Sequence, residues 1–187
     1  MRNKFPKRLV CGVGINDSQT TYKNGTQKQA YIAWNAMLNR AYSAAFHKHW
    51  PSYSECSVAK EWLHFSTFEQ WFEARYKQGY QLDKDILMEG NKEYGPTTCI
   101  LVPAELNMLT IRGGAGQGIS KKKLKSEIKY QARCRIGGKE RYLGLFKTEK
   151  EAEAAIKTAK REKLAGLRPL ADSIDARLYE ALERILT

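Results

Sequence analysis

A glycine-rich run, Gly113-Gly114-Ala115-Gly116-Gln117-Gly118, divides the chain into two parts. Glycine has no side chain to pack and retains wide backbone freedom, so such a run is typical of a linker. The spacing fits neither of the glycine patterns that cradle phosphates in nucleotide-binding loops. The 187 residues are enough for two small domains. We predict domains at 1–112 and 124–187, joined by a Gly/Lys-rich linker at 113–123.

The positive charge of the chain is concentrated after the glycine run. Lys and Arg number 32 against 20 Asp and Glu, and 16 of these cations but only 6 of the acids fall within 120–168. A field of this kind attracts phosphate chains, so nucleic acid is the first partner to consider. The alternative is a merely solvated surface. The 42% content of hydrophobic residues argues against disorder.

Membrane and secretory signals are missing from the sequence pattern. No stretch approaches the ~20 apolar residues that a membrane helix needs, and the apolar run after 1–8 is too short for a signal peptide. The four cysteines form no C-x-x-C pair and are expected to be free thiols. We therefore expect a cytoplasmic protein with no membrane partner and no small-molecule substrate.

The part before the glycine run contains two helical patterns and two strand-like runs. Helical spacing of apolar residues covers 30–46, and the capping box Ser66-Thr67-Phe68-Glu69 starts a second helix. Runs at 81–87 and 98–102 have strand character. Pro103 then suits the first turn of a short helix through about Thr110. Residues 1–29 carry no chemical role that we can assign.

A β-hairpin and two helices are predicted after the glycine run. Apolar and polar residues alternate over 130–136, and Gly137-Gly138 is a hairpin turn signal that leads into 139–146. Counting from this turn places Arg135 opposite Glu140 and Arg133 opposite Tyr142, all on one face. A second capping box at 148–151 starts a helix to about Leu164, and a final helix is expected at 173–186.

The hairpin and its helix resemble the Apetala-type DNA-binding domain of plant transcription factors and phage homing endonucleases. The shared pattern L-G-x-F-x-T-x-x-E-A runs from Leu143 to Ala152. The resemblance implies a three-stranded antiparallel sheet that packs on one helix and places its free face in the major groove of double-stranded DNA. Glu140 stands where the family has an arginine, and it would pair with Arg135 or accept from a cytosine amino group. The expected DNA contacts are Lys121, Lys122, Lys123, Lys129, Arg133, Arg135, Lys139, Arg141 and Tyr142.

The first part resembles phage HNH-type endonucleases. The similarity lies in W-x-x-M-L-x-R at 34–40, an aromatic block at 61–71, and L-D-K-D-I with its continuation in 79–107. It implies a ββα-metal unit of strand, loop, strand and helix around one divalent cation. Asp83 and Asn107 would then hold Mg²⁺ or Mn²⁺, with Asp85 as the alternative ligand.

The usual general-base histidine of that family is replaced by Lys84. An ordinary lysine is protonated at neutral pH and is a poor base. Three explanations stay open: Lys84 acts in its neutral form, Asp85 or His64 takes the role, or cleavage has been lost. A zinc site is not expected, because the spacing of His47, His49, Cys56 and His64 matches no standard zinc-binding pattern.

These features predict an α+β chain with a helical, HNH-like N-terminal part and a C-terminal DNA-binding part. The first functional hypothesis is a phage HNH-type, homing-like endonuclease that acts on double-stranded DNA in the host cytoplasm. The alternative is a catalytically inactive DNA-binding regulator or host-takeover protein, which would also bind a host or phage protein. RNA binding is a weaker third interpretation, because basic and aromatic residues also bind unpaired bases.

Overall fold

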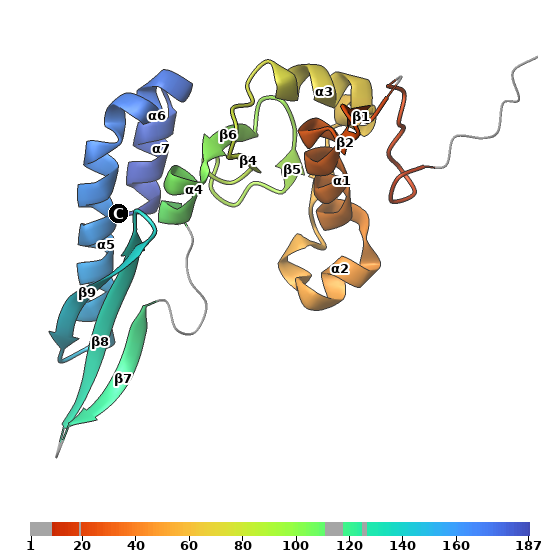
Figure 1. Ribbon diagram of the computed structural model, residues 1–187. Coiled ribbons are helices and arrows are strands. Elements are labelled where there is room, and N and C mark those ends of the chain that lie inside the picture. The colour runs from red at the N-terminus through yellow and green to blue at the C-terminus, as the bar shows by residue number, and fades with distance from the viewer. Residues whose placement is uncertain (1–8, 19, 111–117, 125–126) are drawn as a thin grey trace, which may run out of the picture. The chain divides into compact units, whose positions relative to one another are not determined.

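The structure, a computed structural model, describes residues 9–18, 20–110, 118–124 and 127–187. It is an α+β protein of helices and small sheets, whose elements are labelled in Figure 1. The contacts divide the chain into two compact units, Met1–Leu101 and Val102–Thr187. Within the described part, no helix combines the length and apolarity needed to cross a membrane.

The first unit consists of short elements joined by loops. Its two-stranded sheets are β1–β2, which is antiparallel, and β3–β5, which is parallel. A third pair joins β4 to β6 (Ile100–Pro103), the strand at which the sequence passes into the second unit. The elements are β1 (Tyr22–Lys23), β2 (Thr26–Gln27), α1 (Gln29–Tyr42), α2 (Ala44–His49), η1 (Pro51–Tyr53), β3 (Ser57–Val58), η2 (Lys60–Leu63), α3 (Phe65–Glu73), β4 (Tyr80–Asp83) and β5 (Glu93–Tyr94).

Aromatic side chains form the core of the first unit. Trp34 of α1 packs on Phe65 of α3 with 5.3 Å between ring centroids, and Trp62 meets Phe68 edge to face at 5.0 Å. The indole Nε1 of Trp34 donates to the backbone oxygen of Trp62 at 2.7 Å, so the polar atom of this buried side chain is satisfied. The aromatic pattern of the two predicted helices is thus a core pattern.

The predicted helix at 30–46 is interrupted, which corrects the sequence expectation. α1 ends at Tyr42, and Ser43 adopts an extended conformation with ψ 113°. The Ser43 hydroxyl accepts a hydrogen bond from the amide of Phe46 and caps α2. Serine is a favoured N-cap because its oxygen satisfies an otherwise free amide, so one periodic stretch becomes two helices.

α3 is capped from a distant segment and not by the predicted capping box. The helix begins at Phe65, and both the amide and the hydroxyl of Ser66 donate to the carboxylate of Asp17. Glu69, the expected partner of Ser66, instead pairs with the ammonium of Lys28 at 2.8 Å. Asp17 therefore supplies the negative charge that favours a helix N-terminus.

The second unit contains the predicted three-stranded antiparallel sheet, in the order β7–β8–β9. α5 covers one face of it, where Ala132 and Cys134 of β8 pack against Ala152 and Ile156. Small alanines let the helix approach the strands closely. The elements are α4 (Ala104–Thr110), β7 (Ile119–Leu124), β8 (Glu127–Ile136), β9 (Lys139–Phe146), α5 (Glu149–Gly166), α6 (Arg168–Ile174) and α7 (Leu178–Ile185).

The second predicted capping box is confirmed, whereas the final helix is divided. Thr148 accepts from the amide of Glu151, whose carboxylate accepts from the amide of Thr148 in return. The expected helix at 173–186 is split because Asp175 binds the amide and guanidinium of Arg177 and forms a turn between α6 and α7. Leu178 and its neighbours on α7 are buried, as a core role requires.

The observed units divide the chain before the glycine run. α4 belongs to the second unit, because Lys160 of α5 donates to the Leu109 carbonyl at 2.9 Å and Lys163 pairs with Glu105 at 2.5 Å. The predicted linker at 113–123 falls partly on 111–117, outside the described residues. Its last residues, 119–123, are part of β7.

Gly118 fixes the entry into the sheet of the second unit. Its carbonyl accepts from the amide of Arg133 at 2.6 Å, and its φ is +79°. A Cβ at this position would lie 1.8 Å from the carbonyl oxygen of Arg133. Only glycine allows this approach, since both the steric contact and the left-handed backbone oppose a side chain.

Gly118→Ala should destabilise the sheet of the second unit by about 3 kcal/mol, from the clash added to the conformational strain. Gly137→Ala is the matched control, because this hairpin glycine has φ +59° but open space around it. It should cost only about 1 kcal/mol. Hydrogen exchange of the β8 amides measures both effects, and equal losses in the two variants would contradict the proposed role of the close contact.

Candidate nucleic-acid interface

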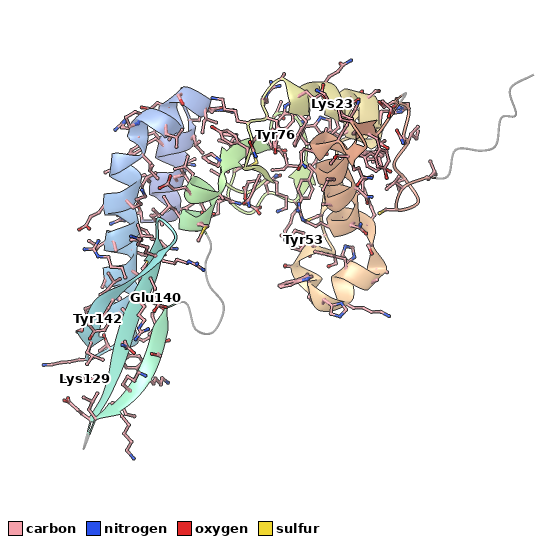
Figure 2. The ribbon with its side chains drawn as sticks, in the orientation of Figure 1. Lys23, Tyr53, Tyr76, Lys129, Glu140 and Tyr142 are labelled. Atoms are coloured by element: carbon pink, nitrogen blue, oxygen red, sulfur yellow. The ribbon has the colours of Figure 1, made fainter. Side chains whose placement is uncertain are left out.

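Side chains of β8 alternate between the two faces of the β7–β8–β9 sheet. Ala132 and Cys134 are buried under α5, whereas Arg133 and Arg135 are exposed on the opposite face. The register pairs Arg133 with Tyr142 and Arg135 with Glu140, which confirms the pairing counted from the hairpin turn. Figure 2 labels Lys129, Glu140 and Tyr142. We call this surface the open sheet face, and its polar residues and tyrosine are Ser120, Lys122, Glu127, Lys129, Gln131, Arg133, Arg135, Glu140 and Tyr142.

The remaining residues predicted to contact DNA lie on the other side of the strands. Lys139 stands opposite Ile136 and Arg141 opposite Cys134, both of which belong to the side covered by α5. Arg141 lies 3.9 Å from Glu162 of α5. On β7, Lys121 is opposite Tyr130, with its ammonium 5.8 Å from the ring centroid, and Lys123 shares that side. The structure therefore separates the predicted basic residues into two groups.

Ion pairs organise the cations of the open sheet face. Glu140 accepts from Nη1 of Arg133 at 2.7 Å, and Glu127 binds the ammonium of Lys129 at 2.9 Å. The expected pairing of Glu140 with Arg135 is corrected, since Nε of Arg135 donates to the carbonyl of Gly138. The diagonal position of Arg133 brings its guanidinium to Glu140, because diagonal neighbours on a sheet are within reach of long side chains.

The charge balance of the open sheet face is positive among the described residues. Lys122, Lys129, Arg133 and Arg135 stand against Glu127 and Glu140. The Arg133–Glu140 pair is exposed, with side-chain accessibilities of 48% and 63%, and Lys129 is half-buried beside an exposed Glu127. Exposed pairs contribute little to stability, so these arginines and lysines can exchange their partners for other anions at small cost.

A β-bulge shapes this face. Ala132 is opposite Gly144 and Arg133 opposite Tyr142, which leaves Leu143 as the extra residue of β9. Bulges bend a strand and increase its twist. Tyr142, opposite Arg133, and Leu145, opposite Gln131, are exposed by 55% and 42% on this face. The face thus combines donors of hydrogen bonds with apolar contact area on a twisted ribbon.

The residues predicted to bind metal lie at the end of β4 and on α4. Asp83, in the first unit, uses one carboxylate oxygen to accept from the amides of Asp85 and Ile86, at 2.7 and 2.8 Å. Burial raises the pKa of Asp83 above its ordinary value, despite these two amides. Asn107 lies on α4 in the second unit. The two predicted ligands therefore do not belong to one compact unit.

Lys84 is the one charged side chain that is buried among the described residues, with 7% exposure. Its ammonium donates to the carboxylate of Asp85 at 2.5 Å and to the carbonyl of Asn91 at 2.7 Å. It also lies 5.8 Å from the ring centroid of Tyr94. The lysine that stands in the place of the general base thus holds together the loop between β4 and β5.

Asn91 completes this loop, and sequence analysis assigned it no role. Its side-chain amide donates to the carbonyls of Lys84 and Glu93 at 2.9 and 2.7 Å, and its side-chain oxygen accepts from the amide of Glu93. The signal was present in the sequence, because an asparagine after Gly90 is typical of a turn that the side chain stabilises. Lys84 and Asn91 therefore form a reciprocal clasp.

The donors around β4 fit a divalent cation poorly. One oxygen of Asp83 is occupied by two amides, and Asp85 is bound by the buried ammonium of Lys84. Mg²⁺ needs several oxygen ligands in octahedral geometry, and a lysine ammonium beside them opposes a second cation. Across the described ranges, no three His, Cys, Asp or Glu side chains gather to hold a metal ion. These residues therefore do not fit Mg²⁺ or Mn²⁺ as a catalytic metal.

The histidines have local partners. His47 and His49 bond to the carbonyls of Arg40 and Ala45, and Nδ1 of His64 lies 3.0 Å from Asp17. Hydrogen bonds from Ser66 and His64 outweigh the effect of burial and lower the pKa of Asp17. These contacts account for the histidines without a shared metal.

Replacing Asn91 by alanine should lower the free energy of unfolding of the first unit by about 3 kcal/mol, because three hydrogen bonds are lost together. All four tryptophans lie in this unit, so denaturant unfolding followed by indole fluorescence reports on it directly. Asn39→Ala is the control, because the hydrogen bonds of this side chain to Asn35 and from Cys11 are exposed to water, and it should change stability by less than about 0.5 kcal/mol. A similar effect of both variants would refute the clasp.

Comparisons of the chain with protein-family models, with curated proteins and with solved structures found no match to any of them.

Proposed function

We propose that the protein binds double-stranded DNA through the open sheet face of its second unit. The observation that carries this proposal is that Arg133, Arg135, Lys122 and Lys129 lie on the same face of the sheet as Tyr142, opposite the side covered by α5. The resemblance to Apetala-type domains, stated above from the sequence, points to the same face.

The side chains of this face suit the chemistry of a duplex. A two-stranded ribbon enters the major groove, where a guanidinium can donate two hydrogen bonds to guanine or bind a phosphate. Tyr142 and Leu145 offer apolar contact to sugars and thymine methyl groups. Glu140 repels phosphate unless it stays paired with Arg133 or accepts from a cytosine amino group. Lys122 and Lys129 add phosphate contacts along the strand direction.

Arg133→Ala and Arg135→Ala should each weaken binding to a duplex by about tenfold, the loss typical of one arginine contact to a base or phosphate. Anisotropy of a labelled duplex, titrated at two salt concentrations, measures the affinity and its salt dependence. Arg141→Ala is the matched control, because it removes the same charge from the opposite side of β9. Its effect should be less than about twofold. Equal losses in all three variants would rule out the open sheet face as the binding surface.

A second candidate function is metal-dependent cleavage of DNA by an HNH-type site. The observation in its favour is the order β4, loop, β6 and α4, in which Asp83 ends the first strand and Asn107 lies on the helix. The occupied carboxylates of Asp83 and Asp85 and the buried Lys84 count against it. Binding without cleavage is therefore the function that the geometry supports better.

Incubation of the protein with long duplex DNA, in Mg²⁺, in Mn²⁺ and in EDTA, separates the two candidates. We expect salt-sensitive binding and no products that depend on metal, because the loop donors are already engaged. Asp83→Ala should then behave as the unchanged protein does in this assay. Discrete products that require both the metal and Asp83 would instead establish the nuclease.

A further inference from the structure

α2 and η1 form a projection of the first unit, which follows the C-terminal end of α1 (Figure 1). None of the residues of α2 is buried, so core packing does not explain the helix. Trp50, between α2 and η1, is 58% exposed. In contrast, Trp34 and Trp62 are exposed by 0% and 1%. Trp50 is the most exposed of the four tryptophans, and its indole offers a large apolar area to a ligand.

The backbone around Trp50 is held in place. Its amide donates to the carbonyl of Phe46 at 3.0 Å, and its carbonyl accepts from the amide of Tyr53 at 3.1 Å. The rings of Phe46 and Tyr53 (labelled in Figure 2) pack edge to face at 5.5 Å. Pro51, which directly follows Trp50, restricts the backbone at the start of η1. The indole is thus presented on a braced turn, which reduces the entropy lost when it binds a ligand.

The surroundings of Trp50 in the sequence are basic. Neither Asp nor Glu occurs between Asp17 and Glu55. His47, Lys48 and His49 directly precede the tryptophan, and they are the basic residues in the last turn of α2. An exposed ring two residues from Lys48, with no acid between Asp17 and Glu55, complements a flat base attached to a phosphate.

We propose that Trp50 is a stacking site for an unpaired base of single-stranded nucleic acid, with Lys48 bound to the adjoining phosphate. Bases stack on aromatic side chains irrespective of sequence, and a cation beside the ring secures the backbone. This site lies in the first unit and uses none of the residues of the open sheet face. It therefore gives the protein a second mode of nucleic-acid contact, for the unpaired strand.

The test is titration of the full chain with a short oligothymidylate, followed by indole fluorescence. Stacking should quench the emission of the exposed Trp50 and protect it from acrylamide, whereas Trp34 and Trp62 are buried and Trp71 is half-buried in either state. Trp50→Ala should abolish the quenching and weaken binding about tenfold. Trp50→Phe should retain part of the affinity, because it keeps a ring. Lys48→Ala should reduce the slope of log K against log salt by about 0.7.

Met88→Ala is the control, because it removes an apolar side chain of similar exposure, 55%, beside the acidic Glu89. It should leave oligothymidylate binding unchanged. The Arg133→Ala/Arg135→Ala double variant separates this proposal from the sheet interface, since it should keep the quenching of Trp50 even if duplex binding is lost or never present. Unchanged oligothymidylate affinity in Trp50→Ala, or the absence of binding in the unaltered protein, would overturn the proposal in favour of another kind of partner, such as a protein.

Discussion

The packing of α5 against one face of the β7–β8–β9 sheet determines what the second unit can do. Ala132 and Cys134 of β8 pack against Ala152 and Ile156 of α5. The residues between them on β8 therefore lie on the uncovered face of the sheet. Because strand side chains alternate, covering one side with apolar contacts assigns the arginines to the other. A slip of one residue would bury Arg133 and expose the core. The same contacts that stabilise the unit thus set the position of its cations.

Features that depend on neighbouring residues could be predicted from the sequence, and features that depend on distant contacts could not. The Gly137-Gly138 turn fixes the register to Tyr142 and Glu140, and the capping box of α5 is local as well. In contrast, the cap of α3 comes from Asp17, far away in sequence, and α4 joins the second unit through Lys160 and Lys163. Periodicity carries no information about such partners.

The candidate sites show the same distinction at the level of single atoms. Alternation placed Arg133 and Arg135 on a common face, yet which of them Glu140 binds depends on the diagonal reach of side chains. Around β4, the sequence pattern predicts catalytic or metal-binding roles for Asp83, Lys84 and Asp85. In the fold, Asp83 instead accepts from backbone amides of the loop, and Lys84 bonds to Asp85 and to Asn91. Residue types that bind metals are also those that satisfy backbone amides, so only the observed partners separate the two uses.

The two surfaces differ in how their side chains are prepared for a ligand. Arg133 and Lys129 rest in ion pairs whose acidic partners are exposed, so a phosphate can replace the carboxylate at little cost. Their flexible stems must, however, be ordered on binding. Trp50 has few rotatable bonds and sits on a turn that Phe46 and Tyr53 brace. An interface of the first kind depends strongly on salt and follows the charge of a duplex, whereas a stacking site depends more on an accessible base. With both proposed surfaces, in separate units, the chain would contact paired and unpaired strands by different physical means.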